Sequence, residues 1–162
     1  MTDRNKNSYQ TYIYDFIKDI LEVCPQCSKS AIVKSDGFSF RDYDKEIKVI
    51  CTSCGFNKKL TEKPTSVLYS ASNDKTIESR HLIIGAPIDP FFHLPLWIKE
   101  NVNGNFLWAY NFEHLEVIRN FVDSKLRERN GDDFSNKSLG SRLPKWLISK
   151  NNRETVLKTI EK

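Results

Sequence analysis

The chain has no continuous apolar run long enough to cross a membrane, and residues 1–10 are too polar for a signal peptide. We therefore expect a cytoplasmic protein with no membrane partner. Its 162 residues leave room for one ordinary domain and a small appendage.

Residue types that mark common catalytic sites are scarce. The chain has six glycines, none in a phosphate-binding loop, and no serine in the context of a nucleophile elbow. Its three histidines are His81, His93 and His114. Asp89 with His93 and His114 could form a hydrolytic site only if the fold brought them together. We expect structural histidines, and a non-enzymatic protein without a small-molecule substrate.

Cysteine occurs at four positions only, in two pairs that are each separated by two residues. The four are Cys24, Cys27, Cys51 and Cys54. This spacing is typical of a closed four-thiolate zinc site, which stabilises a fold and leaves no position for substrate. Gly55 suits the left-handed turn that follows such a pair, whereas Ser28 fits the matching place less well. The alternatives are two disulfides or a dithiol redox pair, which the expected compartment and the flanking sequence disfavour. We predict one structural Zn²⁺.

The segment between the cysteine pairs has the pattern of a small antiparallel sheet. Strands are expected over 31–33, 38–40 and 47–50, with a tight turn at Asp36-Gly37. The sequence thus predicts a three-stranded zinc ribbon over residues 24–62.

Apolar residues before the ribbon recur with the period of a helix. Tyr9, Tyr12, Ile13, Phe16, Ile17, Ile20 and Leu21 form this stripe. An amphipathic helix is therefore expected within residues 1–23. It should pack on the C-terminal part of the chain, or alternatively on a partner or a second copy.

Residues 63–80 are polar and are expected to be a linker with at most one strand, near 66–69. Residues 81–162 are expected to form an α+β domain. Asn103-Gly104 lies between two apolar runs, which predicts a β-hairpin that pairs Val102 with Asn105 and Lys99 with Trp108.

Helices are expected after the hairpin. Asn111 can cap a helix that runs from Phe112 to about residue 129, and a shorter helix should begin near Pro144. Asn151 and Glu154 have the spacing of a capping box before a last helix. The predicted class is α+β: an N-terminal amphipathic helix, a zinc-ribbon sheet, and a β-hairpin packed with C-terminal helices.

The net charge of +4, from 25 basic and 21 acidic residues, is unevenly distributed. The ribbon and the segment 125–153 are basic, and the stretch between them is close to neutral. Basic and aromatic residues in these regions are candidates for contacts with nucleic acid or a protein partner. They are Lys48, Lys58 and Lys59 in the ribbon, Lys99 and Trp108 in the hairpin, and Arg142, Lys145, Trp146 and Lys150 near the C-terminus.

Several motifs resemble those of a family of small bacterial proteins described as containing a transcription-factor-IIB-type zinc ribbon. They are GAPIDPFF at 85–92, LPLW at 94–97, LWAYN at 107–111, EHL at 113–115, LRER at 126–129, SRLPKW at 141–146 and NRE at 152–154. The resemblance covers the chain after residue 20 and implies a zinc ribbon but no activity. Relatives often carry cysteines just before the LWAYN block, where this chain has residues 101–105 and no cysteine. Any metal chemistry at that place in the relatives is therefore absent here.

Two functions are compatible with these features. The first is a non-enzymatic module that binds nucleic acid or the transcription machinery. The alternative is a protein-interaction adaptor or accessory subunit of a larger bacterial complex, docking through the aromatic helix or the hairpin.

Overall fold

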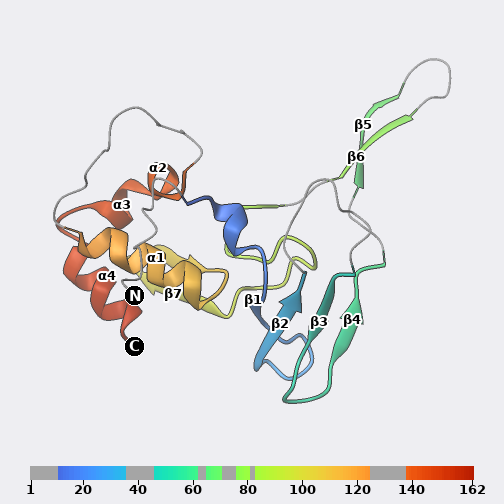
Figure 1. Ribbon diagram of the computed structural model, residues 1–162, viewed down its shortest axis with the longest axis horizontal. Coiled ribbons are helices and arrows are strands. Elements are labelled where there is room, and N and C mark those ends of the chain that lie inside the picture. Colours follow the sequence, from blue (N-terminus) through green and yellow to red (C-terminus); the bar gives the residue numbers. More distant parts are fainter. Residues whose placement is uncertain (1–10, 36–45, 62–64, 71–75, 81–82, 125–137) are drawn as a thin grey trace, which may run out of the picture.

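The computed structural model is of the mixed α+β class (Figure 1). It describes residues 11–35, 46–61, 65–70, 76–80, 83–124 and 138–162. The turn expected at Asp36-Gly37 and the strand expected over 38–40 lie outside these residues.

The ribbon is a four-stranded antiparallel sheet. Its strands, β1 (Ile20–Val23), β2 (Ser30–Lys34), β3 (Lys48–Ile50) and β4 (Asn57–Lys59), lie in the order β1-β2-β3-β4. The expected strands near 31–33 and 47–50 correspond to β2 and β3. Two of its strands were not predicted: β1, which precedes the predicted ribbon, and β4, which follows the second cysteine pair within it.

The helix expected within residues 1–23 is not observed in the described residues. A single 3₁₀ turn, η1 (Ile13–Phe16), is followed by β1. Asp19 has a φ of 49°, which a right-handed helix cannot accommodate. Phe16 at the end of η1, Ile17 after it and Ile20 at the start of β1 are all buried in one core. Their spacing produced the helix-like apolar periodicity.

Strand β1 connects the ribbon to the C-terminal half of the chain. One edge pairs with β2, from Ile20 opposite Val33 to Val23 opposite Ser30. On the other side, Leu21 N–H donates to the Tyr110 carbonyl at 2.8 Å, and Val23 N–H donates to the Pro95 carbonyl at 2.8 Å. Both edges of β1 are therefore hydrogen-bonded. Figure 1 shows β1 between β2 and the helices.

The expected linker contains two strands rather than one at most. Strands β5 (Thr65–Ser70) and β6 (Thr76–Arg80) pair antiparallel as a separate hairpin. In Figure 1 this hairpin extends away from the rest of the molecule.

The Asn-Gly hairpin is confirmed with its register. Strands β7 (Ile98–Val102) and β8 (Asn105–Ala109) pair Val102 with Asn105 and Lys99 with Trp108. Asn103 and Gly104 have φ values of 52° and 84°. Positive φ at both central positions is the geometry that makes Asn-Gly the preferred two-residue turn.

Replacing Gly104 with alanine should lower the free energy of unfolding by about 1 kcal/mol, because a Cβ disfavours the left-handed backbone. No atom lies within 4 Å of the Cβ position, so the cost is conformational and not steric. Urea unfolding measures the effect. Asn105→Ala, in the adjacent strand, is the control, and an unchanged midpoint for Gly104→Ala would contradict the turn geometry.

Helix α1 (Phe112–Asp123) begins where the sequence predicted, because the Asn111 side chain accepts a hydrogen bond from His114 N–H at 2.9 Å. The same side chain donates to the carbonyls of Phe16 and Lys18, at 3.2 and 2.9 Å. Asn111 therefore caps α1 and also fixes the N-terminal segment against it. The predicted extension to about residue 129 lies outside the described residues.

Three short helices follow α1 within the described residues. They are α2 (Leu139–Arg142), α3 (Lys145–Ile148), which follows Pro144 as predicted, and α4 (Arg153–Ile160). Helix α2 was not predicted. The capping box expected from Asn151 is not formed: the N-cap of α4 is Asn152, whose side chain donates instead to the Trp146 carbonyl at 2.8 Å.

In the part of the chain that the structure describes, buried side chains form two clusters. The first joins the ribbon to the N-terminal segment and the chain around Phe91, Leu96 and Tyr110. The second contains hairpin residues such as Leu107 with residues of α1, α3 and α4, and no ribbon residue. No helix in the described part of the chain is long and apolar enough to span a membrane.

Candidate metal centre and neighbouring sites

The four cysteines meet at one end of the ribbon sheet. Their sulfur atoms all lie within 4.8 Å of one another. Cys24 Sγ is 3.6 Å from Cys54 Sγ, and Cys27 Sγ is 3.6 Å from Cys51 Sγ. Tetrahedral coordination with Zn–S bonds of about 2.3 Å places sulfurs about 3.8 Å apart. The cluster can therefore hold one metal ion, whereas a disulfide needs sulfurs about 2 Å apart.

Each cysteine pair sits on the same kind of turn. Ser28 N–H donates to the Cys24 carbonyl and Gly55 N–H to the Cys51 carbonyl, both at 2.9 Å. Ser28 and Gly55 have φ values of 60° and 77°. The serine thus adopts the left-handed conformation that glycine takes in the second turn, and the two turns present their sulfurs in the same way.

Without a cation the cluster cannot carry four negative charges. Burial raises the pKa of Cys51, but hydrogen bonds from the N–H groups of Cys54 and Ser53, together with those from the Cys27 and Cys54 side chains, lower it to about 6. The Phe56 N–H lowers the pKa of Cys54, yet desolvation and the other three sulfurs raise it to about 12. A divalent ion would remove this conflict, because it neutralises half of the thiolate charge.

Four protein ligands would fill a tetrahedral site. Cys24 and Cys51 are buried, Cys27 is half-buried and only Cys54 is exposed. Such a site has no open position for water or substrate, so its chemistry is structural.

A buried carboxyl lies next to the metal ligands and was not anticipated from the sequence. Glu22 is fully buried, and burial, followed by the charge of Asp89, raises its pKa to about 9. Asp89 is close enough to affect that pKa, but neither Glu22 oxygen makes a hydrogen bond of good geometry with any described residue. A glutamate within the apolar stretch before Cys24 was the only signal for it.

The possible hydrolytic site is not assembled. The Asp89 carboxylate accepts hydrogen bonds from the N–H groups of residues 91, 92 and 94, at 2.7 to 2.9 Å. His93 is exposed, and His114 stacks on Phe16 with ring centroids 4.8 Å apart. No hydrogen bond joins Asp89 to either histidine in the described part of the chain. Asp89 therefore holds a turn together.

The candidate binding residues fall into separate groups. Lys48 and Lys59 both contact Glu46, at 3.3 and 2.9 Å, which neutralises part of the ribbon charge. Lys58 is exposed on β4. Lys99 lies over the Phe106 ring, 5.3 Å from its centroid. Figure 1 shows β4 and α3 at opposite ends of the molecule, so the ribbon and C-terminal cations do not form one surface.

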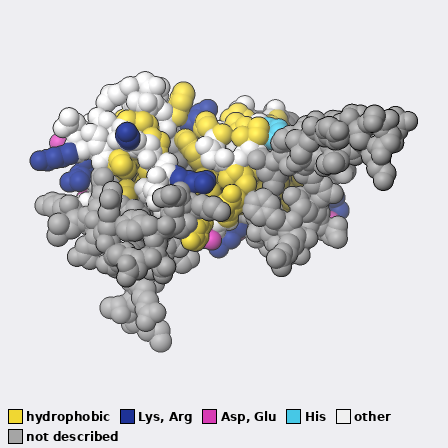
Figure 2. Space-filling model, turned by 90° about the horizontal axis from the view of Figure 1, so that it is seen from above, with side chains coloured by type: hydrophobic (Ala, Val, Ile, Leu, Met, Phe, Trp, Pro, Cys, Tyr) yellow, Lys and Arg dark blue, Asp and Glu magenta, His cyan; other side chains and the backbone are white. Residues whose placement is uncertain are grey.

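The C-terminal group is the more coherent one. Arg142, Lys145 and Lys150 are exposed, and no ion pair involves them within the described residues. Trp146, which follows Lys145 in the sequence, is half-buried. Arg142, Trp108 and Trp146 line one cavity of about 330 Å³. Figure 2 shows hydrophobic side chains exposed among Lys and Arg side chains on one face of the molecule.

Comparison of the chain with protein-family models, with curated proteins and with solved structures found no match.

Proposed function

We propose that the chain is a non-enzymatic zinc-ribbon protein that binds nucleic acid through its C-terminal surface. The observation that carries this proposal is the group Arg142, Lys145 and Lys150, which are exposed and make no ion pair with any described residue, near Trp146 in the sequence. Cations of this kind contact phosphates, and a partly exposed indole offers a face on which a base can stack. The ribbon would then act as a scaffold, since two of its three candidate lysines already contact Glu46.

The resemblance to the bacterial proteins with a transcription-factor-IIB-type zinc ribbon is part of the same proposal. It rests on the motifs at 85–92, 107–111 and 141–146. A cytoplasmic location would follow from it.

Salt dependence tests the proposal. If the three cations contact three phosphates of a single-stranded oligonucleotide, the affinity should fall roughly 20-fold between 50 and 200 mM salt. The triple variant Arg142→Glu, Lys145→Glu, Lys150→Glu should bind on the order of 100-fold more weakly at low salt, because three attractions become repulsions. Fluorescence anisotropy of a labelled oligonucleotide measures both.

The matched control is Lys48→Glu, Lys58→Glu, Lys59→Glu, which changes the net charge equally at the far end of the molecule. This variant should bind within about threefold of the natural protein at 0.1 M salt, where charges more than about 10 Å apart are screened. Equal losses in both triple variants, or no binding at low salt, would contradict the proposed surface.

An adaptor function is the alternative, favoured by exposed aromatic side chains. Phe112 is 66% exposed, Phe106 52% and Trp97 44%. An adaptor would co-purify with a protein partner in a complex that resists salt, and changing Phe106 and Phe112 to serine would release that partner.

A further inference from the structure

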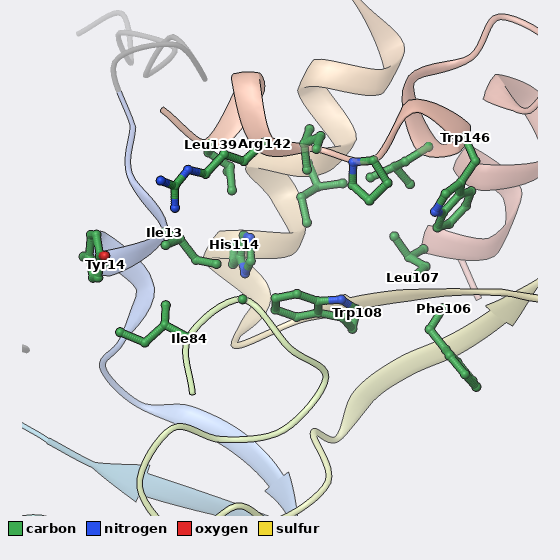
Figure 3. A pocket seen from close by; sticks show the side chains of 15 residues that line it. Ile13, Tyr14, Ile84, Phe106, Leu107, Trp108, His114, Leu139, Arg142 and Trp146 are labelled. Atoms are coloured by element: carbon green, nitrogen blue, oxygen red, sulfur yellow. The ribbon is translucent and has the colours of Figure 1, made fainter. Parts of the chain in front are cut away.

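A cavity of about 330 Å³ lies between β8, α1, the N-terminal turn η1 and the α2–α3 segment (Figure 3). Its volume is near the lower end of the range for small-molecule sites, about 300 to 1,000 Å³. Its walls are mainly apolar, with Trp108 and Trp146 as the largest aromatic surfaces. Apolar walls with a few polar groups are typical of ligand sites.

His114 is the first of two polar groups that matter here. Its Nδ1 accepts a hydrogen bond from Tyr110 N–H at 3.2 Å, so the proton of the neutral ring is on Nε2. The side chain is 2% exposed, and Nε2 has no hydrogen-bond partner among the described residues. We expected a satisfied structural histidine. The structure instead gives this buried donor no hydrogen bond to any described residue, in a ring that lines the cavity, and buried donors without a partner are rare in native proteins.

Arg142 is the second polar group. It lines the same cavity from α2, its side chain is exposed, and it makes no ion pair within the described residues. Figure 3 shows Arg142 and His114 toward one end of the cavity, Trp146 toward the other, and Trp108 between them. One end therefore offers a cation and an N–H donor, and the other is apolar. None of the described residues that line the cavity is acidic.

We propose that this cavity binds a small organic anion, an aromatic carboxylate. Its carboxylate would lie between Arg142 and His114 Nε2–H, and its ring along Trp108 toward Trp146. A carboxylate has the planar geometry that pairs with a guanidinium. Its oxygen can also accept a charge-assisted hydrogen bond from the histidine N–H. A cationic ligand would meet Arg142 without a counter-charge. The cavity shares Arg142 and Trp146 with the proposed nucleic-acid surface, but Lys145 and Lys150 do not line it, so the two proposals can be tested separately.

The test compares three probes of nearly the same shape by calorimetry: phenylacetate, phenylacetamide and phenethylamine. Phenylacetate should bind with a stoichiometry of about one and at least tenfold more tightly than the amide, and the amine should not bind. Quenching of tryptophan fluorescence should follow the same order, because Trp108 and Trp146 line the site.

Variants locate the site. Arg142→Gln should weaken phenylacetate binding about tenfold and leave the amide unchanged, whereas Lys145→Gln, three residues further along the exposed surface, should change neither. His114→Phe, checked for folding by circular dichroism, should weaken both, because the N–H donor is lost. Equal affinity for acid and amide, no effect of Arg142→Gln, or no binding at about 10 mM would overturn the proposal. None of these outcomes bears on the salt-dependent binding of an oligonucleotide.

Discussion

Replacing Cys51 with serine is expected to unfold the four-stranded sheet. Structural zinc sites contribute on the order of 10 kcal/mol to folding, more than the whole stability of many small domains. Strands β3 and β4 have three residues each, and Cys24 and Cys51 are themselves part of the first core cluster. We therefore expect β3 and β4 to depend on the metal site more than β1, which also packs against Leu96 and Tyr110.

The effect should be selective. The second core cluster, around Leu107, Ile118 and Val156, contains no ribbon residue. In amide hydrogen exchange, the Cys51→Ser variant, or natural protein treated with a strong chelator, should lose protection in β2 and β3 while α1 and α4 keep theirs. Ser53→Ala, which changes the same turn without removing a sulfur, is the control. A Cys51→Ser variant with unchanged protection in β2 and β3 would contradict the role of the metal.

Acid should destabilise the protein through His114. Burial lowers the pKa of His114 from about 6.5 to about 4. The unfolded chain therefore takes up a proton at a higher pH than the folded chain does. The neutral His114 side chain therefore contributes about 3 kcal/mol to the free energy of unfolding above pH 6.5. This contribution is lost as the pH falls toward 4.

Carboxyl and thiolate groups also take up protons in this range, so the measurement is a difference. Urea unfolding of the natural protein and of His114→Gln, whose side-chain oxygen can still accept from Tyr110 N–H, is compared between pH 4 and 7.5. The variant should lose about 3 kcal/mol less on acidification. Parallel curves for the two proteins would show that His114 is not held in its neutral form.

Features encoded by neighbouring residues could be predicted from the sequence. The Asn103-Gly104 turn, the Asn111 cap and the spacing within each cysteine pair depend on local backbone geometry. Each pattern therefore predicted both the element and its position.

Features made by distant segments could not be predicted in this way. Strand β1 exists because Ile20 pairs with Val33 and Leu21 contacts Tyr110, and neither pairing leaves a mark in the local pattern. Within residues 11–21, the periodicity correctly indicated that Phe16, Ile17 and Ile20 are buried, but the helical backbone that it predicted is not formed. Asn152 was missed as the N-cap of α4 because its side chain contacts the Trp146 carbonyl.

The same reason explains what was missed at the sites. The four cysteines carry their own spacing, so the cluster was predictable. The cavity takes its walls from segments as far apart as Ile13, Trp108 and Leu147, and its polar groups come from α1 and α2. Arg142, Trp108 and Trp146 were selected for charge and aromaticity, but only the fold shows that they surround one space.

Titration of the metal-free, reduced protein with Co²⁺ tests the central claim most directly, because the absorption of bound cobalt reports both the number of thiolate ligands and the geometry. Four thiolates around one ion predict intense thiolate-to-cobalt charge-transfer bands and tetrahedral d–d bands that saturate at one equivalent, and their loss when Zn²⁺ is added. Saturation at any other stoichiometry, octahedral spectra, or no binding by fully reduced protein would contradict it.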